Sequence, residues 1–245
     1  KNGGVLFTMG KNDLKPEMVT VSADNFSSGT SANAKKKYSA SNTAGYIVYK
    51  NGNNMCMMPG SNANVAVFKG ITNQTTMPTQ APLGYFKDYA SAVTAINEWN
   101  DSTAEYTIWL IHEVGKNENL SLTTPSKAKT VQITSADKKA FYFTNNPTVS
   151  CNTILGNVDF KRVTSTKKAG SDRTSATNGS ISLGKFELTI SKNAKLDSFK
   201  LASISGAGVT SASNLIVEGS TLDPGKLTNV GNVTLNKDSK LVLRQ

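Results

Sequence analysis

The sequence predicts an all-β protein whose larger part is a parallel β-helix, a solenoid in which short strands wind into stacked turns. Two observations predict this class. Serine, threonine and asparagine supply 78 of the 245 residues, and these side chains favour strands and turns over helices. In addition, short apolar runs centred on Ile108, Ile133 and Val158 recur at equal steps along the chain. A long repeat of this kind, with several strands in each period, is typical of a solenoid.

Residues 1–84 are predicted to form a small β-rich region that comes before the solenoid. Its apolar runs have the length of strands and are separated by polar loops. The dipeptide Asn51-Gly52 lies between two of these runs and is a hairpin signal. Pro78 and Pro82 stand among polar residues near the end of the region, which indicates a linker. We therefore place a domain boundary between residues 84 and 85.

One amphipathic helix is predicted directly after this boundary. Apolar side chains recur at spacings of three and four residues from Phe86 to Trp99, which places them on one side of a helix. Asp88 is positioned to cap the first turn of this helix, and Asn100 follows its last residue. Because the first turn of a solenoid has an open end, we expect the helix to cover that end.

Further strands are predicted at long intervals from residue 104 onward, so that residues 85–245 would form one helix-capped solenoid of five or six turns. The main apolar runs lie at residues 106–111, 130–134, 156–163, 186–190, 215–217 and 233–235, and shorter runs lie at residues 120–122, 141–143, 181–183, 199–201 and 241–243. The alternative fold is a β-sandwich, which also contains many short strands. Asn178-Gly179 is a hairpin dipeptide of the kind that a sandwich uses.

The charge of the chain limits its partners. The formal net charge is +10, and it comes from 24 lysines and only 3 arginines. Proteins that read nucleic acids depend on arginine for bidentate contacts, so we expect no nucleic-acid partner. No apolar stretch is long enough to span a membrane, so we expect no membrane insertion. The lysines either keep sheet edges soluble or attract anionic polymers, and the best local candidates for such a contact are Lys35, Lys36 and Lys37.

The sequence gives little support to an enzyme or a metalloprotein. It contains one histidine and two cysteines, and its 17 acidic residues are spread singly. Polysaccharide lyases need clustered carboxylates for calcium, and glycosidases need a pair of carboxylates. Asp159, Asp172, Glu187 and Asp197 would come together only through the fold. We therefore expect no catalytic residue, no metal and no cofactor.

Two features of the sequence leave alternatives open. Cys56 and Cys151 are either two buried free thiols or one disulfide. The equal steps of the repeat also predict that the residues four positions after the stacked apolar centres form a column, which consists of His112, Asp137 and Arg162. We expect the side chains of Asp137 and Arg162 to lie within hydrogen-bonding distance. Such a column is either a small site for an anion or a sugar, or an ion-pair ladder that closes a corner.

Part of the chain resembles a known kind of bacterial module. The segments that carry the resemblance are residues 84–86, the end of the predicted helix at 95–97, residues 106–110, Leu120, Leu122, Pro125 and residues 130–134. They are similar to modules of large cell-surface proteins from Gram-positive gut bacteria. Those modules are similar to right-handed parallel β-helices of the pectin-lyase-like type, so the resemblance implies a right-handed parallel β-helix here. Residues 45–49 and 55–58 resemble the closing segment of a preceding module. The resemblance covers residues 45–165 and transfers no functional residue.

This resemblance implies an extracellular, non-catalytic scaffold or adhesin at the cell surface. It also implies a monomer within a longer chain of several modules, with host or microbial glycans or cell-wall polymer as partners. A first alternative is a lysine-rich module that binds acidic polysaccharide or cell-wall polymer. A second alternative is a polysaccharide lyase or glycoside hydrolase of the β-helix type.

Overall fold

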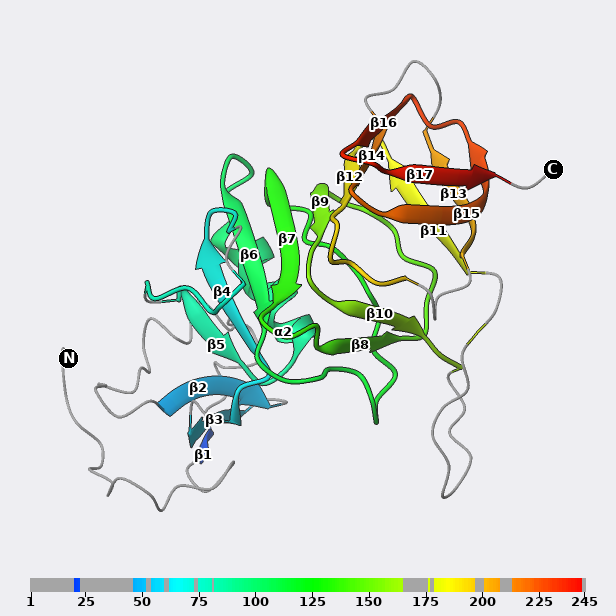
Figure 1. Ribbon diagram of the computed structural model, residues 1–245. Coiled ribbons are helices and arrows are strands. Elements are labelled where there is room, and N and C mark those ends of the chain that lie inside the picture. The colour runs from blue at the N-terminus through cyan, green and yellow to red at the C-terminus, as the bar shows by residue number, and fades with distance from the viewer. Residues whose placement is uncertain are drawn as a thin grey trace.

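The computed structural model describes residues 20–22, 46–51, 54–59, 62–72, 75–80, 82–164, 176, 179–196, 201–207 and 213–243. Its larger part is a parallel β-solenoid of about five turns (Figure 1). A small sheet region precedes the solenoid, and one short helix covers its first turn. Every ladder among the strands from β6 to β17 is parallel. The solenoid prediction is therefore confirmed and the β-sandwich is excluded, whereas the right-handed winding stays a prediction.

The N-terminal region contains an antiparallel sheet in the order β1-β3-β2. Its strands are β1 (Thr20–Ser22), β2 (Tyr46–Asn51) and β3 (Asn54–Pro59). Asn51 pairs with Asn54, so two residues join β2 to β3, as the hairpin signal predicted. Two further strands, β4 (Val65–Lys69) and β5 (Gly84–Phe86), belong to a sheet of the solenoid. That sheet extends across residue 84, and the domain boundary predicted there stays a prediction.

The longest sheet, which we call face 1, has eight strands in the order β16-β14-β12-β9-β7-β6-β4-β5. The strands β4 and β5 are antiparallel to their neighbours and close the N-terminal end of this sheet. The six solenoid strands of face 1 are β6 (Glu105–Leu110), β7 (Thr130–Ser135), β9 (Asn152–Leu155), β12 (Glu187–Ile190), β14 (Asn214–Glu218) and β16 (Asn232–Asn236).

Two shorter sheets form the other faces of the solenoid. Face 2 consists of β8 (Ala140–Phe143) and β10 (Asp159–Arg162), with single bridges to Val114 and Lys195 on either side. Face 3 has the order β11-β13-β15-β17, and bridges through Thr123 and Thr148 extend it to the earlier turns. Its strands are β11 (Gly179–Gly184), β13 (Leu201–Gly206), β15 (Thr221–Thr228) and β17 (Lys240–Leu243).

The strand register confirms one predicted step and corrects the next. Ile108 pairs with Ile133, as predicted. Ile133 then pairs with Leu155, which precedes Val158 in the chain, so the prediction that Val158 occupies this position is wrong. The chain leaves face 1 after Leu155 and turns through Gly156, whose amide donates to the carbonyl of Ile133 (2.8 Å). Val158 is still fully buried, but it lies beyond this corner, next to the start of face 2.

The helix α2 (Tyr89–Trp99) has the N-cap and the C-terminal end that the sequence predicted, but Phe86, which was expected on its apolar side, belongs to β5. The carboxylate of Asp88 accepts a hydrogen bond from the amide of Ser91 (2.7 Å), and Asn100 ends the helix in a left-handed conformation. The hydroxyl of Tyr89 donates to the carbonyl of Thr123 (2.6 Å), and Asn97 accepts from the amides of residues 126 and 127. The helix therefore covers the first turn, while β4 and β5 cover the face 1 side of the same end.

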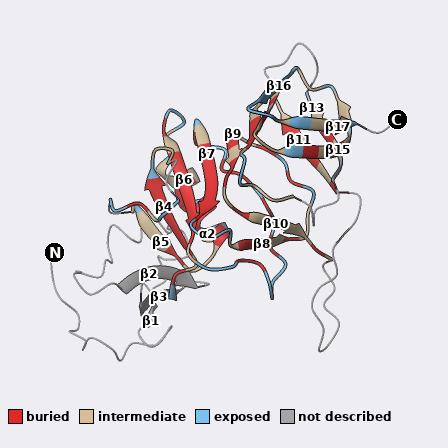
Figure 2. Ribbon diagram, viewed as in Figure 1, coloured by how far each residue is buried: buried red, intermediate tan, exposed pale blue. Residues whose placement is uncertain are grey.

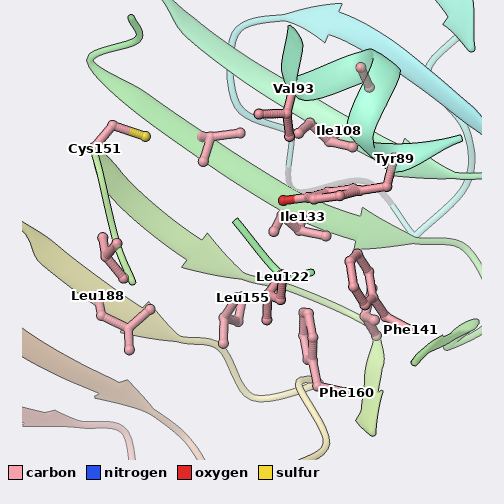
Figure 3. Packing of buried hydrophobic residues seen from close by; sticks show 14 of the residues in the cluster. Tyr89, Val93, Ile108, Leu122, Ile133, Phe141, Cys151, Leu155, Phe160 and Leu188 are labelled. Carbon is pink, nitrogen blue, oxygen red and sulfur yellow. The ribbon is translucent and has the colours of Figure 1, made fainter. Parts of the chain in front are cut away.

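One apolar core runs through the solenoid (Figure 2). Figure 3 shows how helix α2 and several successive turns contribute to it: the rings of Tyr89, Phe141 and Phe160 lie near each other, next to Ile133 and Leu155. The ring centroid of Phe141 is 4.7 Å from that of Tyr89 and 5.9 Å from that of Phe160. Because each turn buries its inner side chains against the next turn, the core exists only through stacking.

Candidate functional site

The predicted polar column lacks its third member, Arg162. His112 and Asp137 each follow a face 1 strand by two residues, and both are exposed. Asp137 pairs with Lys139 (2.9 Å), and this hydrogen bond lowers the pKa of Asp137. Arg162 lies at the far end of β10, where its Nε donates to the carbonyl of Asn145 (3.1 Å). The structure therefore does not bring Asp137 and Arg162 together, because the expected contact assumed that Val158 stacks on Ile133.

The other candidates from the sequence have separate outcomes. Lys35, Lys36 and Lys37 lie outside the described residues, as do Asp172 and Asp197. Asp159 is in face 2 and Glu187 is in face 1, so these two carboxylates belong to different faces. Within the described ranges, no group of three histidine, cysteine, aspartate or glutamate residues could hold a metal ion. None of the described helices has both the length and the apolar character needed to cross a membrane.

The most densely charged group on face 2 is the Asp159 cluster, which we define as Tyr142, Asp159, Lys161 and Lys195. One oxygen of Asp159 lies 3.2 Å from Nζ of Lys161 and 3.9 Å from Nζ of Lys195. The ammonium of Lys161 lies 5.3 Å from the ring centroid of Tyr142, within the range of a cation–π contact. The other oxygen of Asp159 is buried and has no hydrogen-bond partner among the residues that the structure describes.

The Asp159 cluster joins three successive turns. The amide of Asp159 donates to the carbonyl of Lys139 in the turn before it (3.1 Å), and the carbonyl of Lys195 in the turn after it accepts from the amide of Phe160 (2.9 Å). Burial opposes the charge of Lys161, but the hydrogen bond and the attraction of Asp159 outweigh it, so the pKa of Lys161 is raised. Both lysines are thus directed at one carboxylate, and this pairing reduces their attraction for an external anion.

A second group of lysines lies along one corner of the solenoid. We call Lys138, Lys192 and Lys237 the corner lysines, because they follow β7, β12 and β16 by one to three residues, at the corner where the chain leaves face 1. Gly219 lies between the last two. A methyl group added to it would lie 3.4 Å from Cβ of Lys192 and 3.4 Å from the carbonyl oxygen of Lys237.

The corner lysines differ from the lysines of face 2 in their pairing. All three are exposed, and in the described part of the chain none of them forms an ion pair. One face 1 strand separates β7 from β12, and one separates β12 from β16. Neighbouring strands lie about 4.8 Å apart, so positive charges recur about every 10 Å along this corner. An extended polyanion is the kind of ligand that such a row attracts.

Comparisons with known proteins found no matching family model, no matching curated protein and no matching solved structure. The fold is therefore established by the strand registers of this chain alone. The resemblance to pectin-lyase-like surface modules stays a prediction.

Cys151 is a buried free thiol in the core. Burial raises its pKa to about 11, against an ordinary value of 9.0. Burial also raises the pKa of Tyr89, and the nearby Cys151 adds a smaller contribution in the same direction. A thiol that resists ionisation is a weak nucleophile, so Cys151 has the character of a core residue.

The raised pKa of Cys151 predicts a loss of stability at alkaline pH. Below about pH 9 the thiol is protonated in both the folded and the unfolded chain and has no effect. Between about pH 9 and pH 11 the unfolded chain loses this proton first, so the free energy of unfolding falls by up to about 3 kcal/mol. Urea denaturation of the wild type and of Cys151→Ala at several pH values measures this effect. Lysines and tyrosines titrate in both proteins, so the difference between the two reports the thiol, and equal slopes against pH would contradict the prediction.

Proposed function

We propose that this chain is a non-catalytic structural module, an extracellular scaffold that holds an adhesive surface at a distance. The observation that supports this proposal most directly is the continuous apolar core of the solenoid, which extends from Val65 in β4 to Leu222 in β15. A stacked solenoid gains length with each turn and buries each new turn against the previous one. Such a structure suits a stiff spacer.

The corners of the solenoid also support a structural role, because asparagine side chains bond one turn to the next. Asn145 accepts from the amide of Leu122 (2.9 Å), and Asn157 donates to the carbonyls of Ser135 (3.0 Å) and Ala136 (2.8 Å). These side chains satisfy backbone groups that would otherwise face the corner unpaired. Asn145 and Asn157, which belong to the abundant polar residues of this sequence, therefore hold neighbouring turns together.

The scaffold proposal is tested with a panel of acidic polysaccharides. We expect no new reducing or unsaturated sugar ends after incubation with the protein. We also expect beads that carry many copies of the chain to adhere to some of these polysaccharides, while the soluble chain binds them at least 100-fold more weakly, because many weak contacts act together only on the bead. Release of sugar ends, or equally tight binding by the soluble chain, would overturn the proposal.

The corner lysines favour a second function, the binding of acidic polysaccharide or cell-wall polymer. Three exposed cations at regular spacing on one corner provide an electrostatic contact that needs no cleft. Attraction of this kind is screened by salt, since the Debye length falls from about 10 Å at 0.1 M to about 3 Å at 1 M. Binding to polygalacturonate is therefore expected to weaken at least tenfold between these two salt concentrations.

A charge-matched pair of variants tests this second function. Lys138→Gln, Lys192→Gln and Lys237→Gln together are expected to weaken polygalacturonate binding at low salt at least tenfold. The control replaces three exposed lysines on other parts of the surface by glutamine, namely Lys69, Lys127 and Lys226, and removes the same net charge. If both triple variants lose affinity equally, the net charge and not the corner determines binding, and this function is rejected.

A further inference from the structure

The outer side of face 1 differs in charge from the other faces of the solenoid. The chain contains 27 lysines and arginines, but the six solenoid strands of face 1, all of which the structure describes, contain none of them. Strands of the other two faces do carry basic residues, such as Lys161 in β10 and Lys226 in β15. The outer side of face 1 is therefore a surface without cations on a cationic protein.

One row of outward side chains crosses the strands of face 1 parallel to the solenoid axis. Side chains alternate between the two sides of a strand, and the neighbours of these residues in each strand point into the core. The pairing of the strands gives the axial row, which consists of Thr107, Gln132, Ile154, Thr189 and Ile216. From β9 to β14 the methyl groups of this row form an apolar stripe, and its two isoleucines are half-buried.

Polar side chains border this stripe on both sides. Asn152, Glu187 and Asn214 are paired with one another in successive strands, two residues before the members of the axial row. The amide of Glu187 donates to Oδ1 of Asn152 (3.1 Å), and Nδ2 of Asn232 donates to Oδ1 of Asn214 (3.1 Å). Glu218 follows Ile216 by two residues on the other side. The stripe thus lies between amide and carboxylate groups, which can bind hydroxyl groups.

The first part of the axial row is already occupied by an extended segment of this chain. The hydroxyl of Thr107 donates to the carbonyl of Gly70 (2.8 Å), and the amide of Thr72 donates to Oε1 of Gln132 (3.0 Å). This segment advances from β6 to β7, which is the direction of the solenoid axis. The outer side of face 1 therefore holds an extended chain through polar side chains, and the same row continues to β14 beyond it.

We infer that the outer side of face 1 from β9 to β14 binds an uncharged polysaccharide whose chain runs along the axial row. A pyranose ring has C–H groups on its faces and hydroxyl groups at its edges, which match an apolar stripe between polar borders. The spacing of about 4.8 Å between strands is also close to the length of one such ring. The inference rests on the adhesive role proposed above and adds a ligand that the corner lysines do not select.

The charges on this surface favour a neutral polymer over an acidic one. The charged groups beside the stripe, Glu187 and Glu218, are carboxylates, and they repel a polymer that carries carboxylates of its own. They still accept hydrogen bonds from sugar hydroxyls. Contacts of this kind do not depend on ionic attraction, so salt should have little effect on them.

Adhesion to neutral polysaccharides tests the inference. Beads that carry many copies of the chain are expected to adhere to at least one of cellulose, chitin and mannan, with less than about a twofold change between 0.1 M and 1 M salt. Ile216→Lys is expected to weaken this adhesion about tenfold or more, because it places an ammonium group in the apolar stripe. Thr221→Lys adds the same charge at an exposed position in β15 of face 3 and should leave adhesion unchanged, as should the triple variant of the corner lysines.

A second variant serves if Ile216→Lys fails to fold. Ile154→Ser together with Ile216→Ser removes most of the apolar stripe without adding charge, and it should weaken adhesion about fivefold or more while the circular dichroism stays unchanged. Adhesion that survives this change, that Ile216→Lys strengthens or that 1 M salt abolishes would overturn the inference. So would a dimer in light scattering that Ile216→Lys dissociates, because a second copy would then cover the stripe.

The same beads separate this inference from the scaffold proposal. If they adhere to acidic polysaccharides and to none of the three neutral ones, the scaffold proposal stands and only the inference about face 1 is refuted. If they adhere to neither kind of polymer, both are refuted.

Discussion

Replacement of Phe141 by alanine is expected to lower the free energy of unfolding by about 3–5 kcal/mol. Phe141 is fully buried, and its ring contacts Tyr89 of helix α2, Phe143 of its own strand and Phe160 of the next turn. Its removal opens a cavity where the helix and two turns meet. The three remaining aromatic rings belong to different elements, and hydrogen-bonded backbone holds each in place, so they cannot collapse fully into the space.

Urea denaturation followed by circular dichroism measures this effect. Phe141→Leu keeps most of the volume and should cost less than about 1.5 kcal/mol. Leu83→Ala, at a residue that is 47% exposed, should stay within about 0.5 kcal/mol of the wild type. If Phe141→Ala cost no more than Leu83→Ala, the packing of helix α2 on the first two turns would be refuted.

Gly115→Ala is expected to destabilise the protein by about 2–5 kcal/mol, and the cost has two parts. Gly115 has a positive φ of 78°, and a side chain in such a conformation costs about 1–2 kcal/mol. A methyl group at this position would also overlap with the carbonyl oxygen of Tyr142 and would lie 3.1 Å from Cβ of Leu120. The neighbour that must move is backbone of face 2, so the overlap adds about 1–3 kcal/mol.

Gly70→Ala separates the two parts of this cost. Gly70 has a similar φ of 84°, but a methyl group on it would meet no atom within 4 Å. The control therefore retains the conformational penalty and lacks the steric overlap. Thermal and urea denaturation of both variants should show Gly115→Ala to be the less stable by about 1–3 kcal/mol. Equal stability of the two variants would show that turn 1 and β8 do not approach each other as closely as the structure has them.

The two variants bear on the proposed scaffold role because both act where successive turns meet. In a solenoid the stability of the whole is approximately a sum of the stabilities of the turns and of the contacts between neighbours. Phe141 and Gly115 lie at the contacts of the first turns, beside the helix that covers them. A spacer that bears load needs these contacts to hold, and the covered end is where the structure concentrates its aromatic packing.

Local signals in the sequence were sufficient to predict the elements that depend on only one short segment of the chain. The helix α2 was predicted from its apolar spacing and from Asp88, whose carboxylate does cap it. The hairpin between β2 and β3 was predicted from Asn51-Gly52. Such elements depend on contacts between residues close in sequence, and these contacts can be recognised without knowledge of the fold.

Strands β9 and β15 are among those that the sequence analysis missed, and each was missed for a physical reason. The strand β9 begins with Asn152 and Thr153, although Thr153 occupies an inward position, where it donates to the carbonyl of Cys151 (2.9 Å). The strand β15 contains Pro224 and Gly225 near a shift of register against β17. Proline and glycine within a strand mark a bulge. In a sequence the same two residues indicate a turn, so β15 was not recognised as a strand.

The candidate site could not be predicted because it depends on corner length. The steps between paired residues of face 1 are unequal, since the pairing runs from Ile108 through Ile133, Leu155, Ile190 and Val217 to Leu235. The assumption of a constant step therefore placed Arg162 beside Asp137 incorrectly. The corner lysines carry one signal in the sequence, since each closely follows a face 1 strand, but only the register shows that they share one corner.

By itself the sequence determined that this protein is a stack of β-strand turns with one covering helix. Three properties of the chain indicate this, namely its polar composition, its long apolar repeat and its amphipathic segment. None of them depends on how many residues form the corners between strands. Only the tertiary structure decided which residues lie over one another, because a strand can be recognised from a few neighbouring residues while its partner is fixed by the length of the loops between them. The Asp159 cluster and the corner lysines both arise from that pairing.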